Sequence, residues 1–409
     1  MSATPMATLA LEPFRFAGRL LDRGCLEIAR RRLLREWPRR EAEARDAWFA
    51  APSAKAEGIL IVQPADIGDM VLTSVFLRRL RTAFPSERIV VAAAPLPASL
   101  LRACPLVDAV AVLDAKGIAG ADWITRLHGH EGWWEAAAAL RETHFPAAPP
   151  ALALSLRGER DALAAAAQIV LASSRARLRV GYRLKTLYGT LRSDRLLDLA
   201  LPLPASGHET ERQGLLLAAA TGAPCAAPTL PEVWIAPEAR ARADAIWAAL
   251  RRTDSAHVLL GIGAGKPEKK WPKDRFAALA RRLQTERHLG IVFLGGAEDR
   301  ADAEEIAVLG RLDPARTKNL AGELPLDVTA ALVGGASLFI GNDSGPMHLA
   351  AASPGQIPVL GLFGAQDMER WRPLSPRFRA VQEADLASLP VERVLDEAAA
   401  LMRACALLG

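Results

Sequence analysis

Three glycine-containing segments place charged or polar side chains directly after a short apolar run. The most informative is residues 341–348 (GNDSGPMH). Asp343 or Ser344 suits the cap of a helix, and Pro346 suits its first turn, where a missing N–H breaks no helical hydrogen bond. Free backbone N–H groups and the positive end of a helix dipole would favour a diphosphate there. An ordinary capped helix with His348 facing the core is the alternative.

The second segment is a glycine-rich loop with three lysines, residues 261–272 (GIGAGKPEKKWP). Small residues let a phosphate approach the backbone, and a lysine supplies a point charge. The G-x-x-x-x-G-K-[ST] pattern is absent, so a nucleoside triphosphatase loop is not indicated. Two such loops in one domain could hold one anion from two sides, although a plain solvated loop remains the alternative.

The third segment is residues 63–73 (QPADIGDMVLT), which leads from an apolar run into a helical pattern. Asp69 at this position is suited to remove a proton from an acceptor hydroxyl. It is equally suited to a first helical turn, where the helix dipole stabilises a carboxylate. Asp66, three residues earlier, is a rival for the catalytic role.

Apolar runs of strand length alternate with helical patterns around these segments, which predicts doubly wound α/β domains with parallel sheets covered on both faces. Ligands of such sheets collect at the carboxyl ends of the strands. We expect strands at residues 58–62, 88–93, 109–113, 151–156, 180–182, 257–262, 290–294, 337–340 and 359–363. We expect helices at residues 68–84, 162–172, 209–221, 274–286, 301–310, 326–334 and 346–352.

The length of 409 residues exceeds the size at which single cores stop growing, so two domains are expected. Prolines cluster after the first half of the pattern and place the boundary there. The expected parts are a basic helical extension with its linker, two Rossmann-like domains and a C-terminal helix: residues 1–57, 58–230, 231–390 and 391–409.

Composition is that of an ordinary globular protein, with 51% hydrophobic and 24% charged residues. The four cysteines are far apart and show no metal-ligand spacing, so we expect free thiols and no metal site. We find neither a signal-peptide pattern nor an uncharged apolar run of about 18 residues. A cytoplasmic location is therefore expected.

The net charge of +5 is unevenly spread, because arginines crowd residues 15–45. This stretch lies in an amphipathic helical pattern over residues 12–50. Its basic face could be solvated, could lie on the acidic inner face of the cytoplasmic membrane, or could meet nucleic acid, which we regard as the weakest of the three.

The three segments, in this order and spacing, resemble glycosyltransferase family 9, the ADP-heptose:lipopolysaccharide heptosyltransferase family. The resemblance extends over residues 58–390. Its further parts are LSLRG at 154–158, VGY at 180–182, HETER at 208–212, LGGAE at 294–298, LFG at 362–364 and Trp371.

The resemblance implies a GT-B fold, in which two Rossmann-like domains face a central cleft. The N-terminal domain would bind a glycan or glycolipid acceptor and the C-terminal domain a nucleotide-sugar donor. Inversion at the anomeric carbon without a metal or other cofactor is implied, with Asp69 as general base. The implied donor-binding residues are Lys269 at the phosphates, Glu298 at the ribose, Asp343 at sugar hydroxyls, and Ser344, Gly345, Pro346 and His348 around them.

Basic side chains of the first domain suit an anionic acceptor, although a solvated basic face is the alternative. They are Arg157, Arg160, Arg183 and Lys185. Two positions depart from the family pattern: Gln63 replaces a common Lys or Arg, and Arg157 a common Gln. The extension and residues 128–134 (HGHEGWW) have no counterpart we recognise, so acceptor identity should differ there.

The sequence therefore predicts an inverting, metal-independent glycosyltransferase that moves a heptose or related sugar, with ADP-heptose as donor, to a lipopolysaccharide-core-like acceptor. A GT-B enzyme of another reaction, such as a nucleotide-sugar epimerase, and a non-catalytic nucleotide-binding relative are the alternatives.

Overall fold

The computed structural model describes residues 58–114, 136–158, 162–183, 196–223, 229–253 and 256–406. The predictions for residues 1–57 and 128–134, and for Arg160 and Lys185, lie outside this part of the chain. None of the helices described there is both long and apolar enough to span a membrane.

The first half forms a six-stranded sheet in the order β3-β2-β1-β4-β5-β6, with every neighbouring pair parallel. Its strands are β1 (Ile59–Gln63), β2 (Ile89–Ala93), β3 (Ala109–Val112), β4 (Leu152–Ser155), β5 (Leu178–Tyr182) and β6 (Leu199–Leu201). Its helices include α3 (Ile67–Ala83), α4 (Pro95–Ala98), α7 (Ala162–Ser173) and α8 (Glu209–Thr221).

The second half forms another six-stranded parallel sheet, in the order β12-β11-β10-β7-β8-β9. Its strands are β7 (His257–Gly261), β8 (Gly290–Leu294), β9 (Thr317–Asn319), β10 (Leu338–Asn342), β11 (Val359–Phe363) and β12 (Phe378–Gln382). Its helices include α9 (Pro237–Leu250), α10 (Lys273–Glu286), α11 (Arg300–Gly310), α12 (Leu326–Val333), α13 (Gly345–Ala351), α14 (Met368–Trp371) and α15 (Val391–Ala406).

Both sheets have the same topology. Numbered along the chain within each half, the strands lie in the order 3-2-1-4-5-6. The order reverses between β1 and β4 in the first sheet and between β7 and β10 in the second. Open sheets of this type bind ligands at the carboxyl ends of the strands beside such a switch point. The doubly wound expectation is confirmed, and the loops after β1 and β4, and after β7 and β10, become the places to look for a site.

The central strands are buried along their whole length, as expected for a sheet covered by helices on both faces. Three strands were not expected from the sequence, namely β6, β9 and β12. Each lies at one edge of its sheet and is only partly buried. Helix α9 was also not predicted, and it begins within the range where the proline cluster placed the domain boundary.

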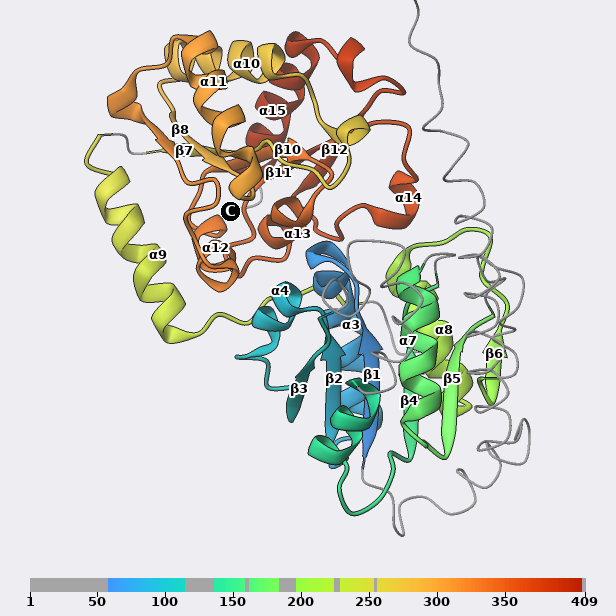
Figure 1. Cartoon of the computed structure of the whole chain (residues 1–409). Coiled ribbons are helices and arrows are strands. Elements are labelled where there is room, and N and C mark those ends of the chain that lie inside the picture. The colour runs from blue at the N-terminus through green and yellow to red at the C-terminus, as the bar shows by residue number, and fades with distance from the viewer. Residues whose placement is uncertain are drawn as a thin grey trace, which may run out of the picture.

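The two halves meet through α13 and α3, which Figure 1 shows one above the other. Two glycines allow this approach. A Cβ at Gly345 would lie 2.8 Å from the Cβ of Ile67, and one at Gly68 would lie 2.9 Å from Cδ2 of His348. Because real Cβ atoms do not come so close, a larger residue at either position would force the two helices apart.

Candidate active site

Lys269 and Asp343 form an ion pair at the switch point of the second sheet. Lys269 lies in the loop after β7, and Asp343 directly follows β10, which is hydrogen-bonded to β7. The Lys269 Nζ donates to Oδ2 of Asp343 at 2.6 Å. The Asp343 side chain is only 6% exposed, whereas that of Lys269 is 28% exposed. The expectation that these two loops follow strands of one domain is confirmed, and the strands are immediate neighbours.

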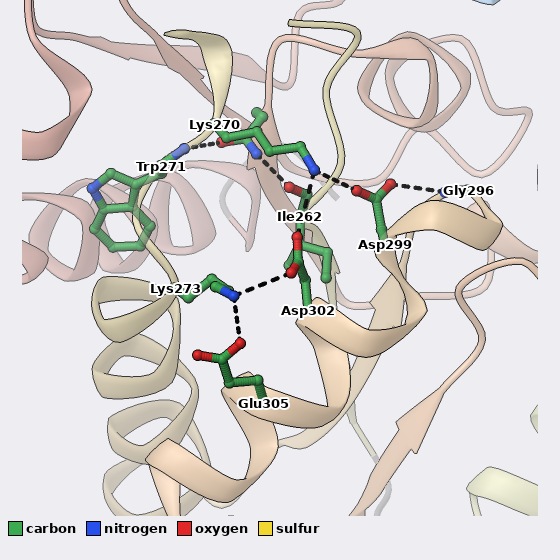
Figure 2. Close-up of polar contacts among 9 residues, drawn as sticks. Ile262, Lys270, Trp271, Lys273, Gly296, Asp299, Asp302 and Glu305 are labelled. Carbon is green, nitrogen blue, oxygen red and sulfur yellow. Dashed lines mark hydrogen bonds and ion pairs between the residues drawn. The ribbon is translucent and has the colours of Figure 1, made fainter. Parts of the chain in front are cut away.

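The neighbouring Lys270 takes a different direction. Its Nζ donates to Asp299 at 2.7 Å and lies 3.5 Å from Asp302 of α11. Burial lowers the pKa of Lys270, but the hydrogen bond and charge of Asp299 outweigh it, so the pKa is raised overall. Figure 2 shows this pair beside Lys273, which bonds to Asp302 and Glu305. Lys270 and Lys273 are therefore engaged within the domain, and Lys269 is the lysine of this loop that meets Asp343.

Helix α13 begins at Gly345, with Pro346 in its first turn as predicted. Ser344 occupies the cap position, but its side chain makes no capping hydrogen bond. Its hydroxyl donates instead to the backbone oxygen of Asn342 at 3.2 Å. The expectation of a side-chain cap is therefore wrong, because Ser344 turns back to the strand and the carboxylate of Asp343 is held by Lys269.

His348 lies in α13, buried against Gly68 and only 5% exposed. Burial lowers its pKa to about 4, with the charge of Asp343 opposing the shift and that of Lys269 adding to it. Among the described residues, its Nδ1 has no hydrogen-bond partner. The ring is therefore neutral near pH 7 and sits where the two halves touch.

Asp69 lies in the first turn of α3, next to the Gly68 that touches His348. A buried network of polar side chains contacts this turn one helical turn further along α3. The Thr73 hydroxyl donates to the backbone oxygen of Asp69 at 2.8 Å, and the amides of Gln63 and Gln213 both donate to that hydroxyl. Gln63, expected as a departure from the family pattern, thus links β1 to α3 without supplying a charge.

Asp66, the rival carboxylate, is the residue before α3 and is exposed. It makes no side-chain capping hydrogen bond. Asp69 belongs to the first turn of the helix and is partly buried, whereas both carboxylates lie one residue from a contact with α13.

Glu298 is exposed in the short turn after β8. Strand β8 pairs with β7, so Glu298 is at the same edge of the sheet as Lys269. In the first half, Arg157 follows β4 and is half-buried, and Arg183 follows the neighbouring β5 and is exposed. Apart from His348, which is buried within α13, the predicted donor and acceptor residues that the structure describes therefore lie at carboxyl ends of parallel strands.

A second junction between the halves lies at the start of α8. Arg370 Nε of α14 donates to Oε2 of the buried Glu209 at 2.8 Å, and its guanidinium stacks on Trp371, 4.2 Å from the ring centroid. The Nε2 of His208 lies 2.8 Å from the backbone oxygen of Arg372. The HETER segment, noted only as part of the family resemblance, is thus a contact between the halves.

Two doubly wound sheets in contact are the architecture of the GT-B fold, here with a lysine–carboxylate pair at one switch point and a helix-borne carboxylate at the other. The model of glycosyltransferase family 9 (heptosyltransferase) matches residues 161–398, more than half of the chain, so the chain belongs to that family. Lipopolysaccharide heptosyltransferase 2 of Salmonella typhimurium is 27% identical over 331 residues, which cover 79% of this chain and 87% of that protein.

Solved structures show the same fold. The structure of Escherichia coli ADP-heptose lps heptosyltransferase II has a TM-score of 0.65 at 24% identity, over 84% of this chain and 98% of that one. A family 9 glycosyl transferase from Veillonella parvula has a TM-score of 0.69 at 20% identity, over 84% and 96%. The family and fold inferred from the sequence motifs are confirmed.

Sequence reasoning gave no role to four polar residues that organise the site: Asn342, Asp299, Thr73 and Gln213. Asn342 offered one signal, because a polar residue ended an otherwise apolar strand pattern. The other three lie within helical or turn patterns, where a polar residue is ordinary.

Proposed function

We propose that the protein transfers a heptose from ADP-heptose to a hydroxyl of a lipopolysaccharide-core-like acceptor, with inversion and without a metal ion. The observation that carries this proposal is the Lys269–Asp343 pair at the switch point of the second sheet, with the helix of Asp69 packed against α13. Membership of the heptosyltransferase family and the named relatives support the choice of sugar and acceptor.

Asp69 would act as the general base. As its carboxylate takes the proton, the acceptor oxygen bonds to the anomeric carbon on the face opposite the nucleotide. The bond from that carbon to the phosphate oxygen breaks, and its electron pair leaves with ADP. A single displacement of this kind inverts the configuration and needs no second carboxylate as nucleophile.

Lys269 would stabilise the departing diphosphate. An ammonium has three donors, so Lys269 can meet a phosphate oxygen while it stays near Asp343. Positive charge fixed beside the leaving group acts where negative charge develops. Asp343 would accept hydrogen bonds from sugar hydroxyls and Glu298 from the ribose, while residues 344–346 and His348 would line the phosphates.

The acceptor would bind on the first half, near the strand ends that carry Arg157 and Arg183. Arginine pairs well with phosphate or carboxylate oxygens, which an anionic core oligosaccharide carries. Arg160 and Lys185 belong to the same proposed set.

The test is a donor panel followed by product analysis. ADP-, GDP- and UDP-sugars are compared by thermal shift, and a matching donor should raise the melting temperature most, because a ligand stabilises the state that binds it. ADP-heptose is then supplied with heptose-deficient core acceptor, with and without a chelator, and the anomeric configuration is read by NMR. Donor turnover without an acceptor, with inversion at another ring carbon, would favour an epimerase instead.

We also propose that the basic extension lets the enzyme meet the inner face of the cytoplasmic membrane, where a lipid-anchored acceptor would be. The support is the arginine-rich composition of residues 15–45. Equal sedimentation of full-length protein and a variant lacking residues 1–54 with anionic vesicles would reject this role.

A further inference from the structure

The loop that carries Lys269 has little of its own to hold it in place. It runs from Ile262, after β7, to Trp271, before α10, and residues 265–268 are exposed. A short turn of 3-10 helix, Pro267–Lys269, lies within it and has no buried residue. The position of Lys269 therefore depends on what holds the two ends of the loop.

Both ends are bound by one buried side chain, Asn342, the last residue of β10. Its Nδ2 donates to the backbone oxygen of Ile262 at 2.7 Å, and the backbone N–H of Trp271 donates to its Oδ1 at 3.0 Å. One partner can only accept and the other can only donate, so the orientation of the amide is fixed. Asn342 is 0% exposed, and bonds at this depth do not compete with water. A single planar group thus holds both ends of the loop.

A second buried side chain, Asp299, ties the same loop to the next strand. It accepts from the backbone N–H of Gly296, after β8, at 2.9 Å, and from Lys270 at 2.7 Å. Its carboxylate fills the space where a Cβ of Gly263 or Gly295 would be. Asp299 is 3% exposed. The loops after β7 and β8 are therefore held against one carboxylate.

These two anchors send consecutive lysines to different partners. Asp299 accepts the hydrogen bond of Lys270 and so directs that side chain toward α11. Asn342 fixes the end of the loop, and Lys269 then reaches Asp343, the residue that directly follows Asn342. Neither Asn342 nor Asp299 needs to touch a ligand for this. Their effect on a ligand would pass through the geometry of Lys269.

We propose that Asn342 is a positioning residue which, with Asp299, holds the Lys269 loop ready for the donor diphosphate. The identity of the ligand rests on the proposed function. The claim that Asn342 and Asp299 order the loop does not depend on that function. Small displacements of a positioning group are costly in enzymes, because the reacting geometry is narrow. A side chain that merely stabilised the domain would not have this effect on the ligand.

The experiment compares Asn342→Ala with Gln284→Ala. Gln284 is a matched control, a buried amide at the far end of α10 that accepts from Asp313 N and donates to Thr317 Oγ1. Binding of ADP is measured by calorimetry, and amide hydrogen exchange is followed over residues 262–271 without ligand. Thermal unfolding reports the loss of stability in each variant.

Asn342→Ala should weaken ADP binding about tenfold, the order expected when one charge-assisted hydrogen bond loses its geometry. Exchange over residues 262–271 should become faster, and Gln284→Ala should change neither quantity at a similar loss of thermal stability. Equal ADP affinity in the two variants, or unchanged exchange in the loop, would overturn the proposal.

The measurements test the identity of the donor and the role of Asn342 separately. If the wild-type protein fails to bind ADP, the proposed donor is wrong, while hydrogen exchange still decides whether Asn342 orders the loop. If Asn342→Ala does not fold, Asp299→Asn replaces it, because it keeps the size of the side chain and removes the charge that holds Lys270. That variant should also speed exchange in the loop and weaken ADP binding, and unchanged values would contradict the proposal.

Discussion

The two halves share one strand order but support their functional side chains differently. In the first half, buried polar groups link a strand to helices: Gln63 of β1 and Gln213 of α8 meet at Thr73 of α3, whose hydroxyl binds the backbone at Asp69. In the second half, buried polar groups hold a loop: Asn342 of β10 binds both ends of the loop after β7, and Asp299 joins that loop to the turn after β8.

The difference follows from what each half carries. A helix is rigid by its own hydrogen bonds, so a carboxylate in its first turn needs only that the helix be seated correctly. A loop has no such continuous set of hydrogen bonds, so a lysine within it depends on how the ends of the loop are held. The comparison predicts that the first half serves the proton transfer and the second half the nucleotide, and the following changes test this division.

The largest effect is expected for Asp69→Asn. The amide keeps the shape of the side chain but cannot take a proton, so turnover should fall about 100- to 10,000-fold, the usual contribution of a general base. ADP affinity, measured by calorimetry, should change little. Asp66→Asn is the control, and a comparable loss of turnover in that variant would move the base role to Asp66.

The burial of His348 at the contact between the halves is tested by the pH dependence of protein stability. Its pKa is lowered to about 4 in the folded protein, so below its ordinary value near 6.5 the unfolded chain takes up the proton first. Stability should therefore fall as the pH drops from about 6.5 toward 4, by on the order of 3 kcal/mol. Urea unfolding at several pH values should show a shallower decline for His348→Gln, and identical slopes would mean that His348 titrates normally.

Lys269→Ala tests the second half. Loss of one charged hydrogen bond should weaken ADP binding about 10- to 100-fold. At saturating donor, turnover should fall less than it does in Asp69→Asn. Lys273→Ala is the matched control, because that nearby lysine is paired with Asp302 and Glu305 of α11. Equal ADP affinity in the two lysine variants would contradict the proposal that the second half binds the nucleotide through Lys269.

The central part of the fold could be predicted because its strands are continuous apolar runs, which reflects burial on both faces. The missed strands β6, β9 and β12 are outer strands, and Thr317–Asn319 contains no apolar residue at all. An outer strand has one partner and a partly solvated surface, so its sequence can lack a long apolar run. The remaining outer strand, β3, was predicted because Ala109–Val112 is continuously apolar. The predicted domain boundaries near residues 230 and 390 remain predictions.

The site could be predicted as a set of segments but not as a set of contacts. That residues 261–272 and 341–348 flank neighbouring strands follows from the α/β pattern. That Lys269 meets Asp343, 74 residues away, or that Asn342 closes a loop 71 to 80 residues earlier in the chain, depends on strand register and side-chain direction. Periodicity specifies neither of these. The roles assigned to Asp69, Lys269, Glu298 and the arginines remain proposals.

The Glu209–Arg370 pair has a mechanical consequence. Together with the contacts of α13 on α3 and of α12 on the short turn Ser99–Leu101, it joins the second half to the first at three places in the described part of the chain. We therefore expect any opening of the two halves to separate at least one of these contacts, which paired spin labels across the junction would show as a changed distance beside the contact that is lost.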